Sequence, residues 1–273
     1  MSKQFLINKF KGSRIIYLSA IYLLILLFSS CKKVIDLKLK DAGPVIVIDG
    51  SITDKLENQI VKVSKIIPFD KPNTFNGLAG AKVTVTTNLG QVINFVLATD
   101  GVYRSSQFKG VSGSTYKLEV TLEGKVYSAT STMPNAVKLD SIKFKKLSIF
   151  GRSRIYPAIY YVDPAQTQNQ YRYIIRVNSK LVTEQVTEDR FNDGNPSSDL
   201  ITFDGDGIES GDKVDIEMQC IDRNVFKYYF AITQIDGNGG PPVAPSNPES
   251  NLTNGALGIF SAHTKTNRSV TLK

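Results

Sequence analysis

Residues 116–122 read Tyr-Lys-Leu-Glu-Val-Thr-Leu, and this stretch decides the fold class of the 273-residue chain. Aromatic and aliphatic residues occupy its even positions, and polar residues occupy its odd positions. Successive side chains of an extended chain point to opposite faces, so the alternation predicts a strand with one buried and one wet face. The Glu123-Gly124 pair that follows is a turn signal, so residues 125–133 are expected to return as a second strand.

The same pattern continues towards the N-terminus, where short alternating segments are separated by turn signals. The expected strands are residues 45–48, closed by Asp49-Gly50, then residues 59–66, the region of Val83 and Val85, and residues 91–97. Asn88-Leu89-Gly90 and Asp100-Gly101 are the expected hairpin turns. Short strands at this spacing without a helix between them predict an antiparallel β-sandwich over residues 44–134.

Residues 137–273 are predicted to form a second, mainly β domain with at most one short helix. The expected strands are residues 137–144, 156–162, 171–177, 180–186, 214–220, 257–262 and 270–272. Residues 225–235 are the best helix candidate, with Asp222 as its cap, although a strand is the alternative there. Residues 188–212 are rich in Asp, Gly, Asn and Ser and are interpreted as a long loop. Together the two domains predict an all-β protein.

The N-terminus has the layout of an export signal. Residues 1–14 are basic, residues 15–28 form an apolar run, and Ser29-Ser30-Cys31 follows. Because a membrane-spanning helix needs about 20 apolar residues, a cleaved signal peptide over residues 1–30 is the preferred interpretation. The small residues before Cys31 resemble a bacterial lipobox, which predicts lipidation of Cys31 and a membrane anchor made of acyl chains. A plain secretory signal with a chance cysteine is the alternative.

Charge and cysteine content limit the classes of partner. Four of the 33 bases lie in residues 1–30, which leaves 29 bases against 25 acids and a net charge of +4. This excess is too small to predict nucleic-acid binding. Residues 31–43 are polar and are expected to be a tether. Lys32 follows the lipidation site instead of the Asp that retains some lipoproteins in the inner membrane, so outer-membrane sorting is expected, on either the periplasmic or the external side.

No convincing catalytic site is evident, and the protein is expected not to be an enzyme and to need no cofactor. His263 is the sole histidine, and it is expected at the surface or at a strand end. No Gly-x-Ser-x-Gly nucleophile motif is present.

Two binding sites are considered. A glycan or peptide platform is one interpretation of a tyrosine-rich segment, and sheet packing is the other. Its residues are Tyr156, Tyr160, Tyr161, Tyr171 and Tyr173. An irregular cation site is one interpretation of an acidic loop, and a solvated turn is the other. Its residues are Asp204, Asp206, Glu209 and Asp212.

Several landmarks in sequence order resemble a known family of envelope lipoproteins. They are the lipobox, Asp49-Gly50, and residues 108–118, 127–134, 245–251 and 255–262. In this order they resemble the lipoproteins grouped as domain of unknown function 4249. The resemblance implies an accessory role with a TonB-dependent outer-membrane receptor and supplies no catalytic residues. Gly80-Ala81 and Gly101-Val102-Tyr103 also resemble small immunoglobulin-like or transthyretin-like sandwiches, which are usually structural or adhesive.

Overall fold

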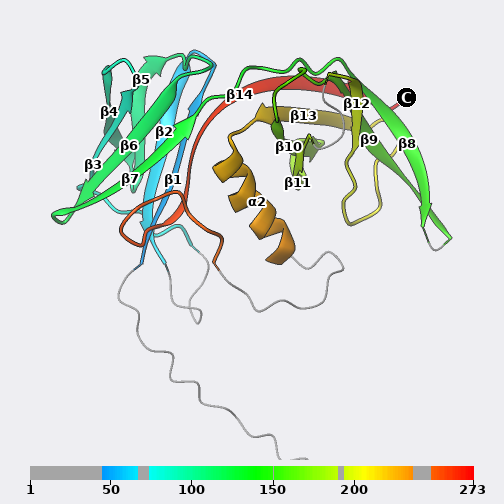
Figure 1. Ribbon diagram of the computed structural model, residues 1–273. Coiled ribbons are helices and arrows are strands. Elements are labelled where there is room, and N and C mark those ends of the chain that lie inside the picture. The colour runs from blue at the N-terminus through cyan, green and yellow to red at the C-terminus, as the bar shows by residue number, and fades with distance from the viewer. Residues whose placement is uncertain (1–44, 67–73, 150, 190–193, 236–246) are drawn as a thin grey trace, which may run out of the picture. The chain divides into compact units, whose positions relative to one another are not determined.

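Strands dominate the computed structural model, which describes residues 45–66, 74–149, 151–189, 194–235 and 247–273 (Figure 1). These described ranges contain fourteen strands and one short helix, which confirms the predicted mainly β class. All of them belong to one compact unit, Gly43–Lys273. The predicted signal peptide, the lipidation site Cys31 and the tether lie outside the described residues.

The N-terminal strands are β1 to β7. Their bounds are β1 Ile46–Thr53, β2 Glu57–Lys65, β3 Lys82–Thr87, β4 Val92–Thr99, β5 Val102–Phe108, β6 Thr115–Leu122 and β7 Lys125–Thr132. The Glu123-Gly124 turn between β6 and β7 forms as expected, and both residues have positive φ angles, the requirement of a tight hairpin turn.

The remaining elements follow in the second part of the chain. They are β8 Ser141–Ile149, β9 Arg152–Val162, β10 Gln170–Val177, β11 Lys180–Glu188, β12 Pro196–Leu200, β13 Lys213–Cys220, α2 Arg223–Ile235 and β14 Leu257–Thr271. The helix predicted over residues 225–235 is found as α2. Asp222 caps it by accepting hydrogen bonds from the amides of Asn224 and Val225 at 2.9 and 3.0 Å.

Eleven of the described strands form one mixed sheet in the order β11-β10-β13-β14-β1-β2-β5-β4-β3-β6-β7. Strands β12, β9 and β8 form a second, smaller sheet. The ladders are antiparallel except the one between β1 and β14, where residue 47 faces residue 257. The large sheet curls until β7 returns to β14, where the Ala262 amide donates to Ser131 Oγ at 2.8 Å. This curl gives the N-terminal strands their sandwich-like organisation.

Two main hydrophobic cores result, and β14 contributes to both. Phe260 and Ala262 lie in the core enclosed by β1 to β7. Val270 and Leu272, at the other end of β14 and just beyond it, pack against the core of β9, β10 and β13. The division into domains 44–134 and 137–273 stays a prediction, and the sequence did not anticipate that residues near the C-terminus complete the first core.

Three local expectations were wrong. Asp49-Gly50 is not a turn, because β1 runs through it: an added Cβ at Gly50 would lie only 3.1 Å from the Phe260 ring, so glycine serves packing there. The expected strands 257–262 and 270–272 are one continuous strand, β14. The expected loop 188–212 contains β12.

Candidate functional site

The five predicted tyrosines do not form an exposed platform. Tyr156, Tyr161, Tyr171 and Tyr173 are buried in the second core, and Tyr160 alone is half-buried. Burial is possible because their hydroxyls find acceptors: those of Tyr161 and Tyr173 donate to Asp199 at 3.1 and 2.6 Å. The hydroxyl of Tyr171 donates to Asp163 Oδ1 at 2.5 Å. The faces of these four rings are therefore closed to a ligand.

Tyr160 has basic neighbours on the small sheet. Lys143 Nζ lies 4.9 Å and Lys145 Nζ lies 5.8 Å from the centroid of its ring. Because the other four rings are buried in the second core, the aromatic-platform interpretation is corrected to core packing for those four.

The predicted cation site is not assembled either. Asp204, Asp206 and Glu209 are exposed, and Asp212 accepts hydrogen bonds from the Glu209 amide at 2.8 Å and from Asn178 at 2.7 Å. Those bonds lower the pKa of Asp212 and fix a local turn. Within the described ranges, no three His, Cys, Asp or Glu side chains gather so that they could hold a metal ion.

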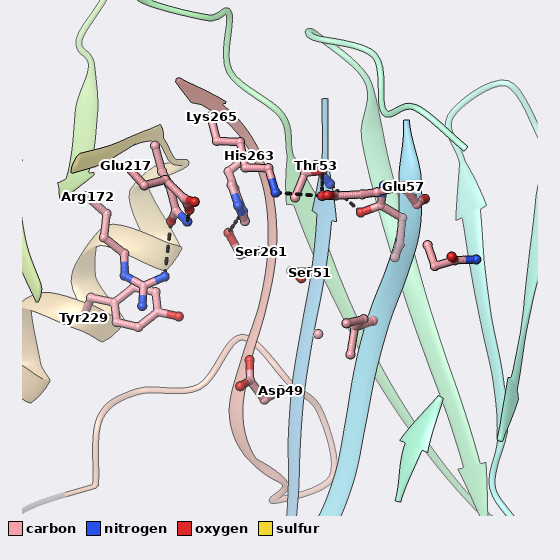
Figure 2. A pocket seen from close by; sticks show the side chains of 15 residues that line it. Asp49, Ser51, Thr53, Glu57, Arg172, Glu217, Tyr229, Ser261, His263 and Lys265 are labelled. Carbon is pink, nitrogen blue, oxygen red and sulfur yellow. Dashed lines mark hydrogen bonds and ion pairs between the residues drawn. The ribbon is translucent and has the colours of Figure 1, made fainter. Parts of the chain in front are cut away.

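A different site, here called the central pocket, has a volume of about 360 Å³ (Figure 2). It lies where β1, β2, β10, β13, β14 and α2 meet. Its polar side chains are Asp49, Ser51, Thr53, Glu57, Asn58, Gln59, Arg172, Glu217, Gln219, Tyr229, Ser261, His263 and Lys265. The volume falls within the range of about 300–1,000 Å³ that is typical of small-molecule sites.

Alternation along β1 and β14 builds the floor of the central pocket. On β14, Ser261, His263 and Lys265 line the pocket, whereas Phe260 and Ala262 point into the first core. The parallel register places Ser51 of β1 beside Ser261 and Thr53 beside His263. Because a strand alternates its faces, the same two strands close the core on one side and present polar groups on the other.

Arg172 forms one wall of the central pocket. Its guanidinium carbon lies 3.8 Å from the centroid of the Tyr229 ring, so the two side chains stack (Figure 2). Its terminal nitrogens donate to Gln219 at 3.2 Å and to Glu184. Its buried Nε has no hydrogen-bond partner among the described residues. Three contacts, with Tyr229, Gln219 and Glu184, thus hold the guanidinium flat against the helix.

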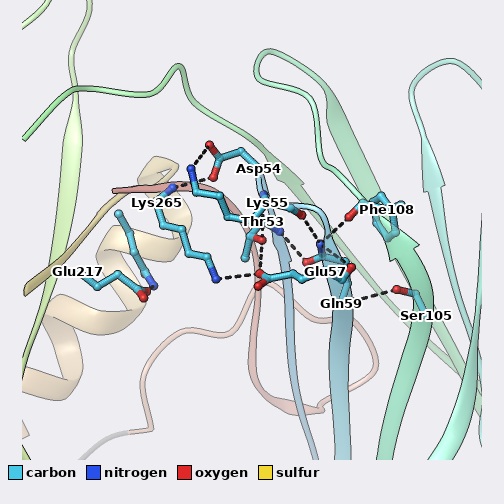
Figure 3. Close-up of polar contacts among 10 residues, drawn as sticks. Thr53, Asp54, Lys55, Glu57, Gln59, Ser105, Phe108, Glu217 and Lys265 are labelled. Atoms are coloured by element: carbon cyan, nitrogen blue, oxygen red, sulfur yellow. Dashed lines mark hydrogen bonds and ion pairs between the residues drawn. The ribbon is translucent and has the colours of Figure 1, made fainter. Parts of the chain in front are cut away.

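Lys265 and Glu57 form the opposite wall. Lys265 Nζ lies 2.7 Å from Glu57 Oε1, and Thr53 also donates to this carboxylate (Figure 3). Burial alone would raise the pKa of Glu57, but the hydrogen bonds from Lys265 and Thr53 outweigh burial and lower it. Glu57 is therefore an anion in the folded protein at neutral pH.

His263 is buried between these two walls, and the expectation that it lies at the surface was wrong. Only 4% of the residue is exposed, and its Nδ1 lies 3.0 Å from Ser261 Oγ. Burial, together with the positive charges of Arg172 and Lys265, lowers the pKa of His263 to about 3. The imidazole is therefore neutral at physiological pH and can exchange hydrogen bonds without carrying charge.

The Ser261–His263 pair lacks the features of an activated nucleophile. Among the described residues, no carboxylate is hydrogen-bonded to the imidazole to orient it. An imidazole with a pKa near 3 is also a weak proton acceptor at neutral pH. The arrangement can bind a polar molecule, and the imidazole itself is poorly suited to act as a general base.

The order of sequence landmarks pointed to one family, and a family model tests that directly. The model described as domain of unknown function DUF4249 matches residues 32–269. The chain belongs to this family. The match begins at the residue after Cys31 and includes every residue that lines the central pocket.

Other comparisons add little to the DUF4249 assignment. A search of curated proteins finds no match. Among solved structures the chain is similar to the adhesin InvE of Yersinia pseudotuberculosis, at 13% identity and a TM-score of 0.22. That alignment covers 84% of this chain and 58% of the adhesin, and a likeness this weak supports no inference. No helix among the described residues of this DUF4249 chain has the length and apolar character to cross a membrane.

Sequence reasoning missed the central pocket of this DUF4249 chain because its members are spread from Asp49 to Lys265. One signal was present: the polar positions 261, 263 and 265 alternate with residues 260 and 262, which are apolar. That alternation predicts a strand with a polar face beyond residue 262, but sequence alone does not reveal what that face meets.

Proposed function

We propose that this protein is a lipid-anchored outer-membrane lipoprotein that acts as a non-enzymatic accessory or interaction module of a TonB-dependent transporter. The observation that carries the proposal is the lipobox-like sequence 27–31, which follows an apolar run too short to span a bilayer. Lys32, in place of an Asp, supports sorting to the outer membrane.

The non-enzymatic part of the proposal is supported by the chemistry of the central pocket. Its buried imidazole has a pKa of about 3, and its only hydrogen bond in the described chain is with Ser261. A general base works best when its pKa lies near the working pH, so this group is poorly suited to proton transfer. The proposal of a transporter partner is based only on the resemblance to DUF4249 lipoproteins. No structural feature of the described residues contributes to it.

Replacing the proposed acylation site tests the anchor. The full chain carrying Cys31→Ser, expressed in a Gram-negative host with a clickable fatty acid, should incorporate no label and should remain unprocessed by the lipoprotein peptidase. Cys220→Ala is the matched control, because Cys220 is the other cysteine and is buried in β13. Labelling that persists in Cys31→Ser would contradict the anchor.

The partner is tested separately by crosslinking in intact cells. We expect that crosslinked, affinity-purified full chain recovers a TonB-dependent receptor, and that Cys31→Ser recovers much less because it is no longer held at the outer membrane. Recovery of no outer-membrane receptor from the correctly anchored protein would overturn the transporter role and leave the anchor intact.

A further inference from the structure

We propose that the central pocket binds an uncharged, polyhydroxylated ligand of the size of a mono- or disaccharide. The proposal goes beyond the anchoring and partner roles above and does not depend on either. Four observations carry it: the pairing of the pocket's cations, the free polar groups on its floor, the burial of its polar side chains, and its volume.

Each cation of the central pocket is already paired with a carboxylate. Lys265 is paired with Glu57, and Arg172 is paired with Glu184 and stacked on Tyr229. An anionic ligand would have to displace one of these carboxylates to reach a cation. It would also approach other acids on the lining, so the charge distribution disfavours phosphate, sulfate and free carboxylates.

Polar groups without a hydrogen-bond partner remain available on the floor and walls of the central pocket. Within the described chain, Asp49 is an exposed carboxylate on the lining with no hydrogen bond to its side chain, and the hydroxyls of Ser51 and Tyr229 have none either. His263 contributes a neutral imidazole whose Nε2 has no hydrogen-bond partner in the same described chain. Carboxylate, hydroxyl and imidazole groups in one pocket complement a ligand whose hydroxyls both donate and accept.

Burial of polar side chains at this one place supports a binding role. Thr53, Gln59, Gln219, Ser261 and His263 all line the central pocket and are each no more than 5% exposed. Burying polar groups costs free energy unless they are hydrogen-bonded, and apolar residues would pack a sheet junction at lower cost. Retaining a connected polar network around an open volume is expected where the network positions groups for a ligand.

The network also makes the pocket rigid before a ligand arrives. Arg172 is held by Gln219, Gln219 donates to Glu217 at 2.6 Å, and Glu57 is held by Lys265 and Thr53. Groups that are already oriented lose little conformational entropy on binding, so a small ligand with several hydroxyls can reach measurable affinity.

Isothermal titration of the full chain, purified in a detergent without a sugar headgroup, tests the proposal. The probes are glucose, galactose and maltose as neutral polyols, glycine and dialanine as zwitterions, putrescine as an amine, and inorganic phosphate as an anion, each at millimolar concentration. We expect saturable binding of at least one neutral sugar and none of the charged probes.

Variants locate the binding. Asp49→Ala removes a carboxyl group that can accept hydrogen bonds and should weaken sugar binding about tenfold or more. Asp140→Ala removes an exposed carboxylate outside the pocket and is the matched control, with no change expected. Ser51→Tyr places a ring in the pocket and should abolish binding, and its melting temperature shows whether it is folded.

Each result decides the proposal. Sugar binding that is weakened by Asp49→Ala, abolished by a folded Ser51→Tyr and unchanged by Asp140→Ala supports it. Binding of charged probes alone, no saturable binding of any probe, or sugar binding that both pocket variants leave unchanged overturns it.

Discussion

Acidification should destabilise this protein through a single side chain, His263. The folded state holds this imidazole neutral, with a pKa of about 3, whereas the unfolded chain has the ordinary value of 6.5. Between these two pKa values the unfolded state binds a proton that the folded state does not. The free energy of unfolding therefore falls as the pH falls below about 6.5, by about 1.4 kcal/mol per pH unit.

The window from pH 7.5 to 5.0 covers most of the range in which His263 acts, and the raised pKa values of Asp49 and Asp163 oppose it. At pH 5.0 the imidazole of the unfolded chain is almost fully protonated, so the expected loss of unfolding free energy is about 2 kcal/mol. Glu57 contributes below this window, because its pKa in the folded state is lowered and its stabilisation is lost only as the pH falls through that value. Asp163 acts in the opposite direction, because burial raises its pKa and the folded state then binds the extra proton.

Urea denaturation of the wild type and of His263→Gln at both pH values, followed by circular dichroism, measures the effect. The variant lacks the imidazole, so its unfolding free energy should fall by about 2 kcal/mol less than that of the wild type across the window. Comparing the change in unfolding free energy between the two pH values in the wild type and in the variant cancels the contribution of Asp163. It also cancels any pH-independent cost of the substitution. Equal pH dependence in both proteins would refute the buried, neutral state of His263.

Three further changes test the fold and the walls of the central pocket. Gly258→Ala should lower the free energy of unfolding by about 3 kcal/mol or more and reduce the melting temperature, because φ is +96° and the added Cβ would lie 2.1 Å from the Ile48 carbonyl oxygen. Asp222→Ala should cost about 1–2 kcal/mol in urea denaturation through loss of the α2 cap, whereas Asp222→Asn should cost less because Asn also caps helices. A double-mutant cycle with Lys265→Met and Glu57→Gln should give a coupling energy of about 1 kcal/mol or less, because 17% and 39% of these side chains are exposed and solvent screens the pair. A coupling energy well above 1 kcal/mol would contradict solvent screening of the pair.

Local features of the fold could be read from the sequence because their signals are local. The Glu123-Gly124 turn, the alternation of residues 116–122 and the Asp222 cap each depend on a few neighbouring residues, and each is found in the structure. The strand expected over residues 214–220 is found in the same way as β13.

Long-range features could not be read in this way. Nothing near Asp49-Gly50 reveals that Phe260 will pack on the glycine, so the dipeptide was mistaken for a turn. The end of β14 was misplaced for a related reason: its polar face looks like a loop until β1 and β13 are known to flank it.

For the candidate site, too, local features could be predicted from the sequence and long-range features could not. Clustering of tyrosines in sequence indicated the second core correctly, but alternation cannot distinguish a buried ring with a hydrogen-bonded hydroxyl from an exposed one. Tyr171 and Tyr173 can be buried because their hydroxyls donate to Asp163 and Asp199. Nothing in the sequence marks these two aspartates as the acceptors. The central pocket needed the pairing of five strands before its members could be recognised as neighbours.

The parallel pairing of β1 with β14 has a consequence for synthesis. β1 comes first along the chain and β14, one of its two neighbours, comes last, so β1 keeps an open strand edge until the final strand is available to pair with it. Such an edge invites association with other chains during the delay. A nonsense codon or proteolytic clip that removed the final fifteen-residue strand would therefore damage the earliest-made part of the protein as much as the latest.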